Sequence, residues 1–108
     1  MSLMTPVPPQ VARLSEPFPY IVCVQLKNDL KQYSLFFDEL RRSIHWMNEL
    51  PNVWIITRYE TMIELSHILT TKIYNGDRLL ILLVVGPATG VMPETAWKWI
   101  NSVVPRLW

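Results

Sequence analysis

Two segments of the chain, 20–26 and 79–85, are apolar on both of their alternating faces. Successive side chains of a β-strand point to opposite faces of a sheet, so a strand with one face in water alternates between apolar and polar residues. Neither segment alternates in this way. Both therefore predict strands that are buried on two sides, and the fold must provide a cover for each face of its sheet.

The composition points to the same requirement. The 108 residues are 50% hydrophobic and 18% charged, and the formal net charge is +1. This length suits one domain with a real core, and the apolar fraction excludes a disordered chain. The charged fraction is below the roughly 25% usual for soluble domains, which predicts exposed apolar surface on the lone monomer. The near-neutral charge argues against an obligate nucleic-acid binder.

The N-terminal residues 1–19 contain five of the nine prolines, a density that prevents a helix and favours an extended arm. We expect residues 1–3 to be a cloning leader and residues 20–108 to form a single domain. The longest apolar run is 79–85, well short of the about 20 residues of a membrane-spanning helix. No secretory signal is recognisable, so we predict a cytoplasmic protein without membrane contact.

The single cysteine, Cys23, cannot form an intrachain disulfide, which fits a reducing compartment. Its place inside an apolar strand predicts a small buried hydrophobic residue rather than a reactive thiol.

Two helices are expected between the strands. In the first, Asn28 or Asp29 is the predicted N-cap, with Gln32 in capping-box spacing after Asp29, and the helix is expected to end around Arg42. In the second, Thr61 and Glu64 have capping-box spacing. Both helices carry an apolar stripe at helical spacing: Tyr33, Phe36, Phe37, Leu40 and Ile44 in the first, and Met62, Leu65, Leu69 and Ile73 in the second.

The segment 44–50 could prolong the first helix or form an edge strand. The turn signal Pro51–Asn52 favours a hairpin that continues into 53–58. Asn75 and Gly76 tolerate the left-handed conformation and are expected to close the second helix. A short final helix is expected between Pro93 and Pro105.

This order of elements predicts an α+β protein with the ferredoxin-like fold, a βαββαβ antiparallel sheet with an additional C-terminal helix. Its two main helices cover one face of the sheet. The C-terminal helix, with Trp97 and Ile100, and the proline-rich arm are expected to cover part of the other face, and a second subunit the rest. We therefore predict a homodimer, with these interface candidates: Val22, Val24, Leu80, Leu82 and Val84.

The chain also resembles a known family over about residues 20–102. The residues that carry the resemblance are the segment 77–81, the glycine- and tryptophan-containing segment 86–100, the pair Trp46 and Trp54, and the pair Tyr33 and Ser34. They resemble the pattern of the small SinR-like proteins, which are similar in fold to the small ferredoxin-like subunit of the CRISPR spacer-acquisition machinery and to VapD-type ribonuclease toxins. The resemblance implies a homodimer in which the sheets face each other.

The resemblance also implies a position for a metal ligand. In the nuclease relatives, an aspartate at the end of the first strand of each subunit is placed to hold a divalent metal across the dimer. The matching residue here is Gln25, and the usual Tyr-Asp pair is Val24-Gln25. A neutral amide is a poor ligand for Mg²⁺. Asp29 could substitute for the missing aspartate, although helix capping explains it more simply. We therefore expect no catalysis and no cofactor, with Mg²⁺ or Mn²⁺ needed only under a nuclease alternative.

Other candidate groups are explained more simply by structural roles. Glu64 and His67 have a spacing found in metal sites but predict a solvated helix face, and His45 is expected to be structural or to lie in an interface. The glycines of the segment 86–90 resemble a phosphate-binding loop, but no lysine directly follows Gly90, which favours a plain turn.

Four cations, Lys27, Lys31, Arg41 and Arg42, lie on or near the first helix and are candidates for contact with a phosphate backbone. Asp38 can pair with the two arginines, which favours a solvated charged face. The predicted function is that of a non-catalytic homodimeric binding protein, acting on another protein or weakly on nucleic acid. The alternatives are a metal-dependent endoribonuclease or toxin-like nuclease, and a sensor that binds a small molecule between subunits.

Overall fold

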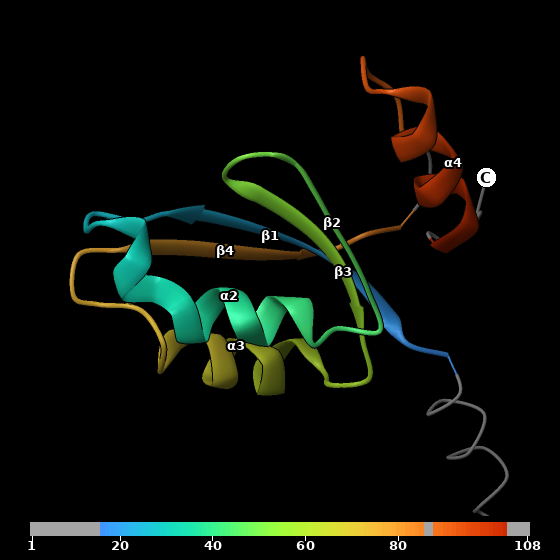
Figure 1. Cartoon of the computed structure of the whole chain (residues 1–108). Coiled ribbons are helices and arrows are strands. Elements are labelled where there is room, and N and C mark those ends of the chain that lie inside the picture. The colour runs from blue at the N-terminus through green and yellow to red at the C-terminus, as the bar shows by residue number, and fades with distance from the viewer. Residues whose placement is uncertain (1–15, 86–87, 104–108) are drawn as a thin grey trace, which may run out of the picture.

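The computed structural model describes residues 16–85 and 88–103. In chain order the elements are strand β1 (Phe18–Gln25), the 3-10 helix η1 (Leu30–Tyr33), α2 (Ser34–Arg41), β2 (His45–Leu50), β3 (Val53–Arg58), α3 (Met62–Thr70), β4 (Arg78–Leu83) and α4 (Glu94–Val103). The strands form one antiparallel sheet in the spatial order β2-β3-β1-β4. Helices α2 and α3 cover one face, and α4 lies on the opposite side at one end (Figure 1). The protein is therefore α+β, and its architecture is compatible with the predicted ferredoxin-like fold.

The strands follow the sequence prediction with shifted ends. The hairpin is confirmed, since the segment 44–50 contributes an edge strand, β2, rather than an extension of the helix. Strand β1 begins at Phe18, two residues before the expected start, because Pro19 pairs at the end of the sheet and its carbonyl accepts a hydrogen bond from Val84 N at 2.9 Å. A proline has no N–H to donate, and near the start of a strand this removes at most one hydrogen bond from the sheet. Residues 1–15, which make up most of the predicted arm, lie outside the described residues.

The start of the first helix differs from its prediction. Neither Asn28 nor Asp29 caps an α-helix there, and a 3-10 turn precedes α2 instead. The predicted capping box is absent: Gln32 N donates to the backbone oxygen of Asp29 at 2.9 Å, and the side chain of Asp29 makes no capping bond. The physical reason is the burial of Tyr33, whose hydroxyl accepts hydrogen bonds from both Asn28 N and Asn28 Nδ2 at 3.1 Å. The side chain of Asn28, one of the two expected cap residues, is therefore bonded to Tyr33 instead of capping the helix.

The second helix begins as predicted. Thr61 Oγ1 accepts from Glu64 N at 3.3 Å, and Glu64 Oε1 accepts from Thr61 N at 2.9 Å, so the capping box is confirmed. The helix ends at Thr70, however, before the predicted closing residues. Gly76 does have a positive φ, of 93°, but it occupies the turn that leads into β4, where this position of a type II turn requires it.

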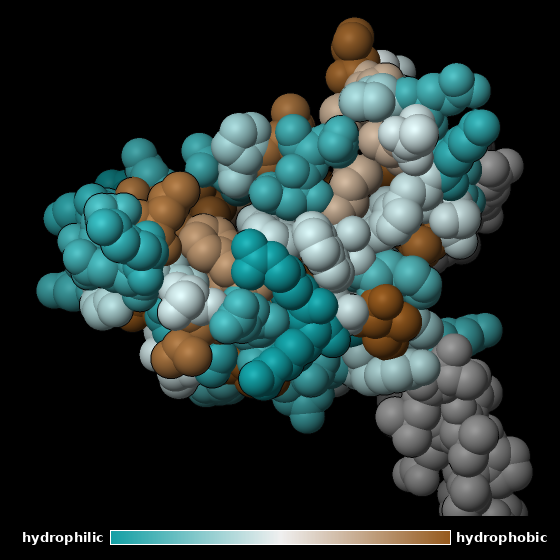
Figure 2. Space-filling view, viewed as in Figure 1, coloured by the Kyte–Doolittle hydropathy of each residue, from teal (hydrophilic) through white to brown (hydrophobic). Residues whose placement is uncertain are grey.

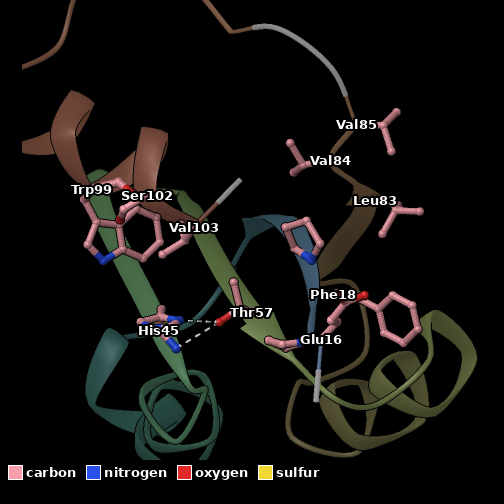
Figure 3. Close-up of a pocket in the computed structure, with 12 residues that line it drawn as sticks. Glu16, Phe18, His45, Thr57, Leu83, Val84, Val85, Trp99, Ser102 and Val103 are labelled. Atoms are coloured by element: carbon pink, nitrogen blue, oxygen red, sulfur yellow. Dashed lines mark hydrogen bonds between the residues drawn. The ribbon is translucent and has the colours of Figure 1, made fainter. Parts of the chain in front are cut away.

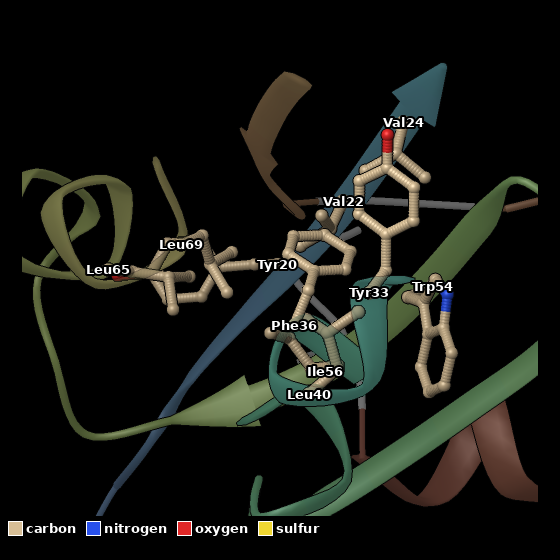
Figure 4. Packing of buried hydrophobic residues seen from close by; sticks show 10 residues of the cluster. All are labelled: Tyr20, Val22, Val24, Tyr33, Phe36, Leu40, Trp54, Ile56, Leu65 and Leu69. Atoms are coloured by element: carbon tan, nitrogen blue, oxygen red, sulfur yellow. The ribbon is translucent and has the colours of Figure 1, made fainter. Parts of the chain in front are cut away.

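The hydrophobic core lies between the sheet and the two helices α2 and α3 (Figure 4). Leu65 and Leu69 of α3 and Phe36 and Leu40 of α2 are completely buried against it. The strand residues that face these helices are Tyr20, Val22, Val24, Trp54 and Ile56. Trp54, which the sequence singled out through the family resemblance, is a core residue.

A buried ion network ties the end of β3 to the end of α2. The side chain of Arg58 is only 6% exposed, and its guanidinium donates to Glu39 Oε2 and to Glu60 Oε1, each at 2.8 Å. Arg58 Nη1 also donates to the backbone oxygen of Glu39 at 2.9 Å. The positive charge of Arg58 is removed from water, so the folded state is stable only while the Glu39 and Glu60 carboxylates compensate that charge.

Replacing the buried arginine is predicted to be far more damaging than replacing an exposed one. Arg58→Ala leaves the Glu39 carboxylate buried without its partner, and we expect a loss of about 3–5 kcal/mol in the free energy of unfolding. Arg42→Ala is the matched control, because Arg42 is exposed and only 3.7 Å from the same carboxylate; its removal is expected to cost about 1 kcal/mol at most. Urea unfolding of both variants measures the difference, and equal losses would contradict this role for Arg58.

The same network predicts an acid sensitivity. The hydrogen bonds from Arg58 lower the pKa of Glu60, and partial burial opposes them only in part. A carboxylate with a lowered folded-state pKa stabilises the fold above the unfolded-state value of about 4.3, and this contribution disappears as the pH falls through the folded-state pKa. Thermal unfolding between pH 6 and pH 3 is therefore expected to show a shallower loss for Glu60→Gln than for the wild type. Parallel curves would exclude Glu60 as a source of this dependence.

Candidate functional site

The face of the sheet away from α2 and α3 is here called the open face. Its side chains form rows across the strands: Ile55, Ile21 and Leu82 align in one row, and Val53, Cys23 and Leu80 in the next. Leu80 is 54% exposed and Leu82 46%. Cys23 is half-buried on this face, rather than fully buried as expected. The structure therefore has a continuous apolar surface on strands β3, β1 and β4.

The opposite side of the molecule is different in character. In the view of Figure 2, hydrophilic residues dominate the surface over α2, and hydrophobic residues appear as separate patches. Single exposed apolar residues of this kind are normal on soluble proteins, whereas contiguous ones mark contact surfaces.

The structure divides the predicted interface residues between the two faces. Leu80 and Leu82 lie on the open face, and Val84 follows β4 beside Pro19 on the same side. The prediction is wrong for Val22 and Val24, which are 0% and 7% exposed and belong to the core under α2 and α3. The cause is the period of two along a strand, which places alternate residues on opposite faces.

Helix α4 crosses one end of the open face and lines one side of an open pocket of about 780 Å³ (Figure 3). Trp99 of α4 stands edge-on to the His45 ring, with 6.5 Å between the ring centroids. His45 Nδ1 and the Thr57 hydroxyl are 3.0 Å apart, and His45 N donates to the same hydroxyl. Thus His45 lies on an edge strand and ties β2 to β3 and α4, a structural role in this chain.

A second concave region, the hairpin cleft, lies between α2 and the β2–β3 hairpin and has a volume of about 660 Å³. It brings Gln25, at the end of β1, together with Lys31 and Arg41, which the sequence placed on or near the first helix. Its walls also include Phe37 and Trp54, whose rings stack with centroids 6.0 Å apart. The guanidinium of Arg41 lies 5.9 Å from the centroid of each ring, a cation–π arrangement.

The other two predicted cations are held elsewhere. Lys27 N donates to Asp77 Oδ1 at 2.8 Å, and the Lys27 side chain packs over Gly76, whose added Cβ would lie 2.8 Å from Lys27 Cδ. Arg42 faces Glu39. The four cations therefore do not form one basic surface, and only Lys31 and Arg41 line the same cleft.

The candidate metal ligands are also separated. Gln25 is exposed at the end of β1 and aligns with Arg78, while Asp29 is exposed with Oδ2 4.0 Å from Lys31 Nζ. Glu64 belongs to the capping box, and His67 is exposed on α3. Within residues 16–85 and 88–103, no three His, Cys, Asp or Glu side chains are grouped to hold a metal ion. The predicted loop 86–90 lies partly outside the described residues.

A tyrosine–aspartate pair joins the end of η1 to the residue that precedes β4. The Tyr33 hydroxyl donates to the carboxylate of Asp77, 2.9 Å from each oxygen, and Lys27 N and Tyr74 N donate to the same group. Partial desolvation raises the pKa of Asp77, but these hydrogen bonds outweigh it and lower the pKa overall. The sequence pointed to Asp77 only through the family resemblance, and to Tyr33 through that resemblance and the apolar stripe of the first helix. The geometry gives both a structural role.

Trp54 leaves one hydrogen-bond donor unused. Its side chain is 3% exposed, and within the part of the chain that the structure describes, Trp54 Nε1 has no acceptor. A buried unpaired donor costs about 1–3 kcal/mol relative to a paired one. Such a group in the wall of a cleft is a feature that periodicity and spacing in the sequence could not have revealed.

A scan against protein-family models and searches of curated proteins and of solved structures found no match to this chain. The resemblance to the SinR-like proteins therefore stays a prediction. Among the described residues, no helix is both long enough and apolar enough to cross a membrane.

Proposed function

We propose that the protein is a non-catalytic homodimeric binding protein whose two copies pack through their open faces. One observation carries this proposal: the continuous apolar rows on β3, β1 and β4, in which Leu80 and Leu82 remain about half exposed. Contiguous apolar surface of this kind is a recurrent property of interfaces and is unfavourable in water.

The proposal includes the ferredoxin-like fold. The element order β1, α2, β2, β3, α3, β4 and the sheet order β2-β3-β1-β4 both fit it. In that arrangement the two helices are on one face, so the other face is free for an identical sheet. Helix α4 occupies one end of the face and leaves β1 and β4 accessible beyond it (Figure 1).

A second copy suits this surface better than a charged partner. The two central rows contain no ionisable side chain other than the Cys23 thiol, so a two-fold axis would bring no like charges together. Strand β4 is also a sheet edge with the sequence RLLILL, and an exposed apolar edge readily pairs with another chain. Both features are self-complementary.

We assign no catalytic step to the protein. The residue at the end of β1 is Gln25, whose neutral amide is a poor substitute for a carboxylate in binding Mg²⁺. Asp29 is 4.0 Å from Lys31 and lies at the start of η1, outside the sheet. The nuclease alternative therefore gains no support from either residue.

The dimer is tested by the molar mass in solution. The wild type is expected to sediment as a dimer at about 50 µM, and Leu80→Lys and Leu82→Lys are expected to shift it to monomer, because each places a charge at the centre of the proposed interface. Ile63→Lys is the matched control: Ile63 is 72% exposed but lies on α3, away from the open face. It should leave the dimer intact.

A monomeric wild type at this concentration would overturn the proposal. A dimer that Ile63→Lys dissociates while Leu80→Lys does not would also overturn it, since the interface would then lie on the helical side. Circular dichroism of each variant checks that the change is in association rather than in folding.

A further inference from the structure

We propose that the hairpin cleft is a binding site for a nucleotide, with its base against the apolar wall and its phosphate at Arg41. This inference is independent of the dimer, because the cleft is on the helix-covered side of the sheet. The residues that line it come from β1, η1, α2 and the hairpin, and all of them lie within the described residues.

The wall of the cleft fits a planar aromatic group. Val24, Leu26 and Phe37 provide apolar surface, and Trp54 lies behind them, stacked on Phe37. Clefts with a mainly apolar wall and a few fixed polar groups are typical of small-molecule sites. A heteroaromatic base matches such a wall, because its π-face is apolar while its edge carries hydrogen-bonding atoms.

The cations determine the charge of the ligand. The Arg41 guanidinium lies over two rings. Lys31 lies along the same cleft, with its side chain 84% exposed and its Nζ 4.0 Å from Asp29 Oδ2. Asp38 Oδ1 is 3.4 Å from Arg41 Nη1 and is the one carboxylate in the cleft wall within the described ranges. This contact is long, and its pair is exposed, so it leaves donors of the guanidinium available for phosphate oxygens.

Polar groups are present for the edge of the base. Asn48 Nδ2 donates to Leu50 O at 2.8 Å and to Val53 O at 2.9 Å, which fixes the amide and leaves its oxygen as the group available to a ligand. Gln25 and Asn52 add exposed amides to the same rim. Amides both donate and accept, as recognition of a base edge requires.

The unused Trp54 donor is an independent indication of a ligand. Trp54 Nε1 is buried without an acceptor, and the half-exposed Arg41 lies over its ring. An acceptor atom that enters as Arg41 moves toward the phosphate would complete this hydrogen bond. Binding would thereby satisfy a group that the free protein leaves unpaired.

The experiment is a titration followed by the indole N–H signals of ¹⁵N-labelled protein. The probes are UMP and AMP, with adenosine for the base alone, ribose 5-phosphate for the phosphate alone, and a single-stranded RNA hexamer. We expect a mononucleotide to bind at least tenfold more tightly than either fragment and to shift the Trp54 indole signal, which Trp54→Phe assigns. If only the RNA hexamer binds and shifts the Trp54 indole signal, the site binds a nucleotide within single-stranded RNA rather than a free mononucleotide.

Two neighbouring arginines supply the matched variants. Arg41→Ala is expected to weaken binding roughly tenfold or more, the loss expected for a charged hydrogen bond, whereas Arg42→Ala, one residue further and paired with Glu39, should leave it unchanged. Equal losses of nucleotide affinity in the two variants would show that binding depends only on the overall positive charge, and would overturn the proposed site. So would tight binding of ribose 5-phosphate alone, or no shift with any probe at millimolar concentration. None of these outcomes depends on whether the protein is a dimer.

Discussion

Two helices can cover only one face of a four-stranded sheet, and the sheet of this protein is apolar on both. The covered face holds the core, where Val22 and Ile56 are completely buried. The open face repeats almost the same chemistry one residue out of phase, with Ile21 and Leu82 in the corresponding places. Helix α4 protects one end of it. The remaining apolar surface is the constraint from which the proposed dimer follows.

The sequence contained enough information for the order and type of most elements. Strands β1 and β4 are short apolar runs, and the Thr61–Glu64 box marks a helix start through contacts only three residues apart. Such local rules succeed where the partners are close in the chain. They failed at the first helix, because Tyr33 is held by Asp77, 44 residues away, and that tertiary bond overrides the local capping preference.

The same distinction explains what could be foreseen of the candidate sites. Alternation along a strand shows that two faces are apolar but not which one the helices cover, so Val22 and Val24 were assigned to the wrong face. Arg58 lacked any signal in the sequence, because its partner Glu39 is 19 residues away on another element. The hairpin cleft likewise requires the fold, which places Gln25 of β1 and Arg41 of α2 in the lining of one cleft.

Cys23 permits the most direct test of the central claim, that a second copy covers the open face. It is the only cysteine of the chain and lies half-buried in the row with Leu80. Its rate of reaction with a maleimide should fall several-fold as the protein concentration rises from 0.1 to 100 µM, and the fall should vanish in Leu80→Lys. A rate independent of concentration in the wild type would contradict the account.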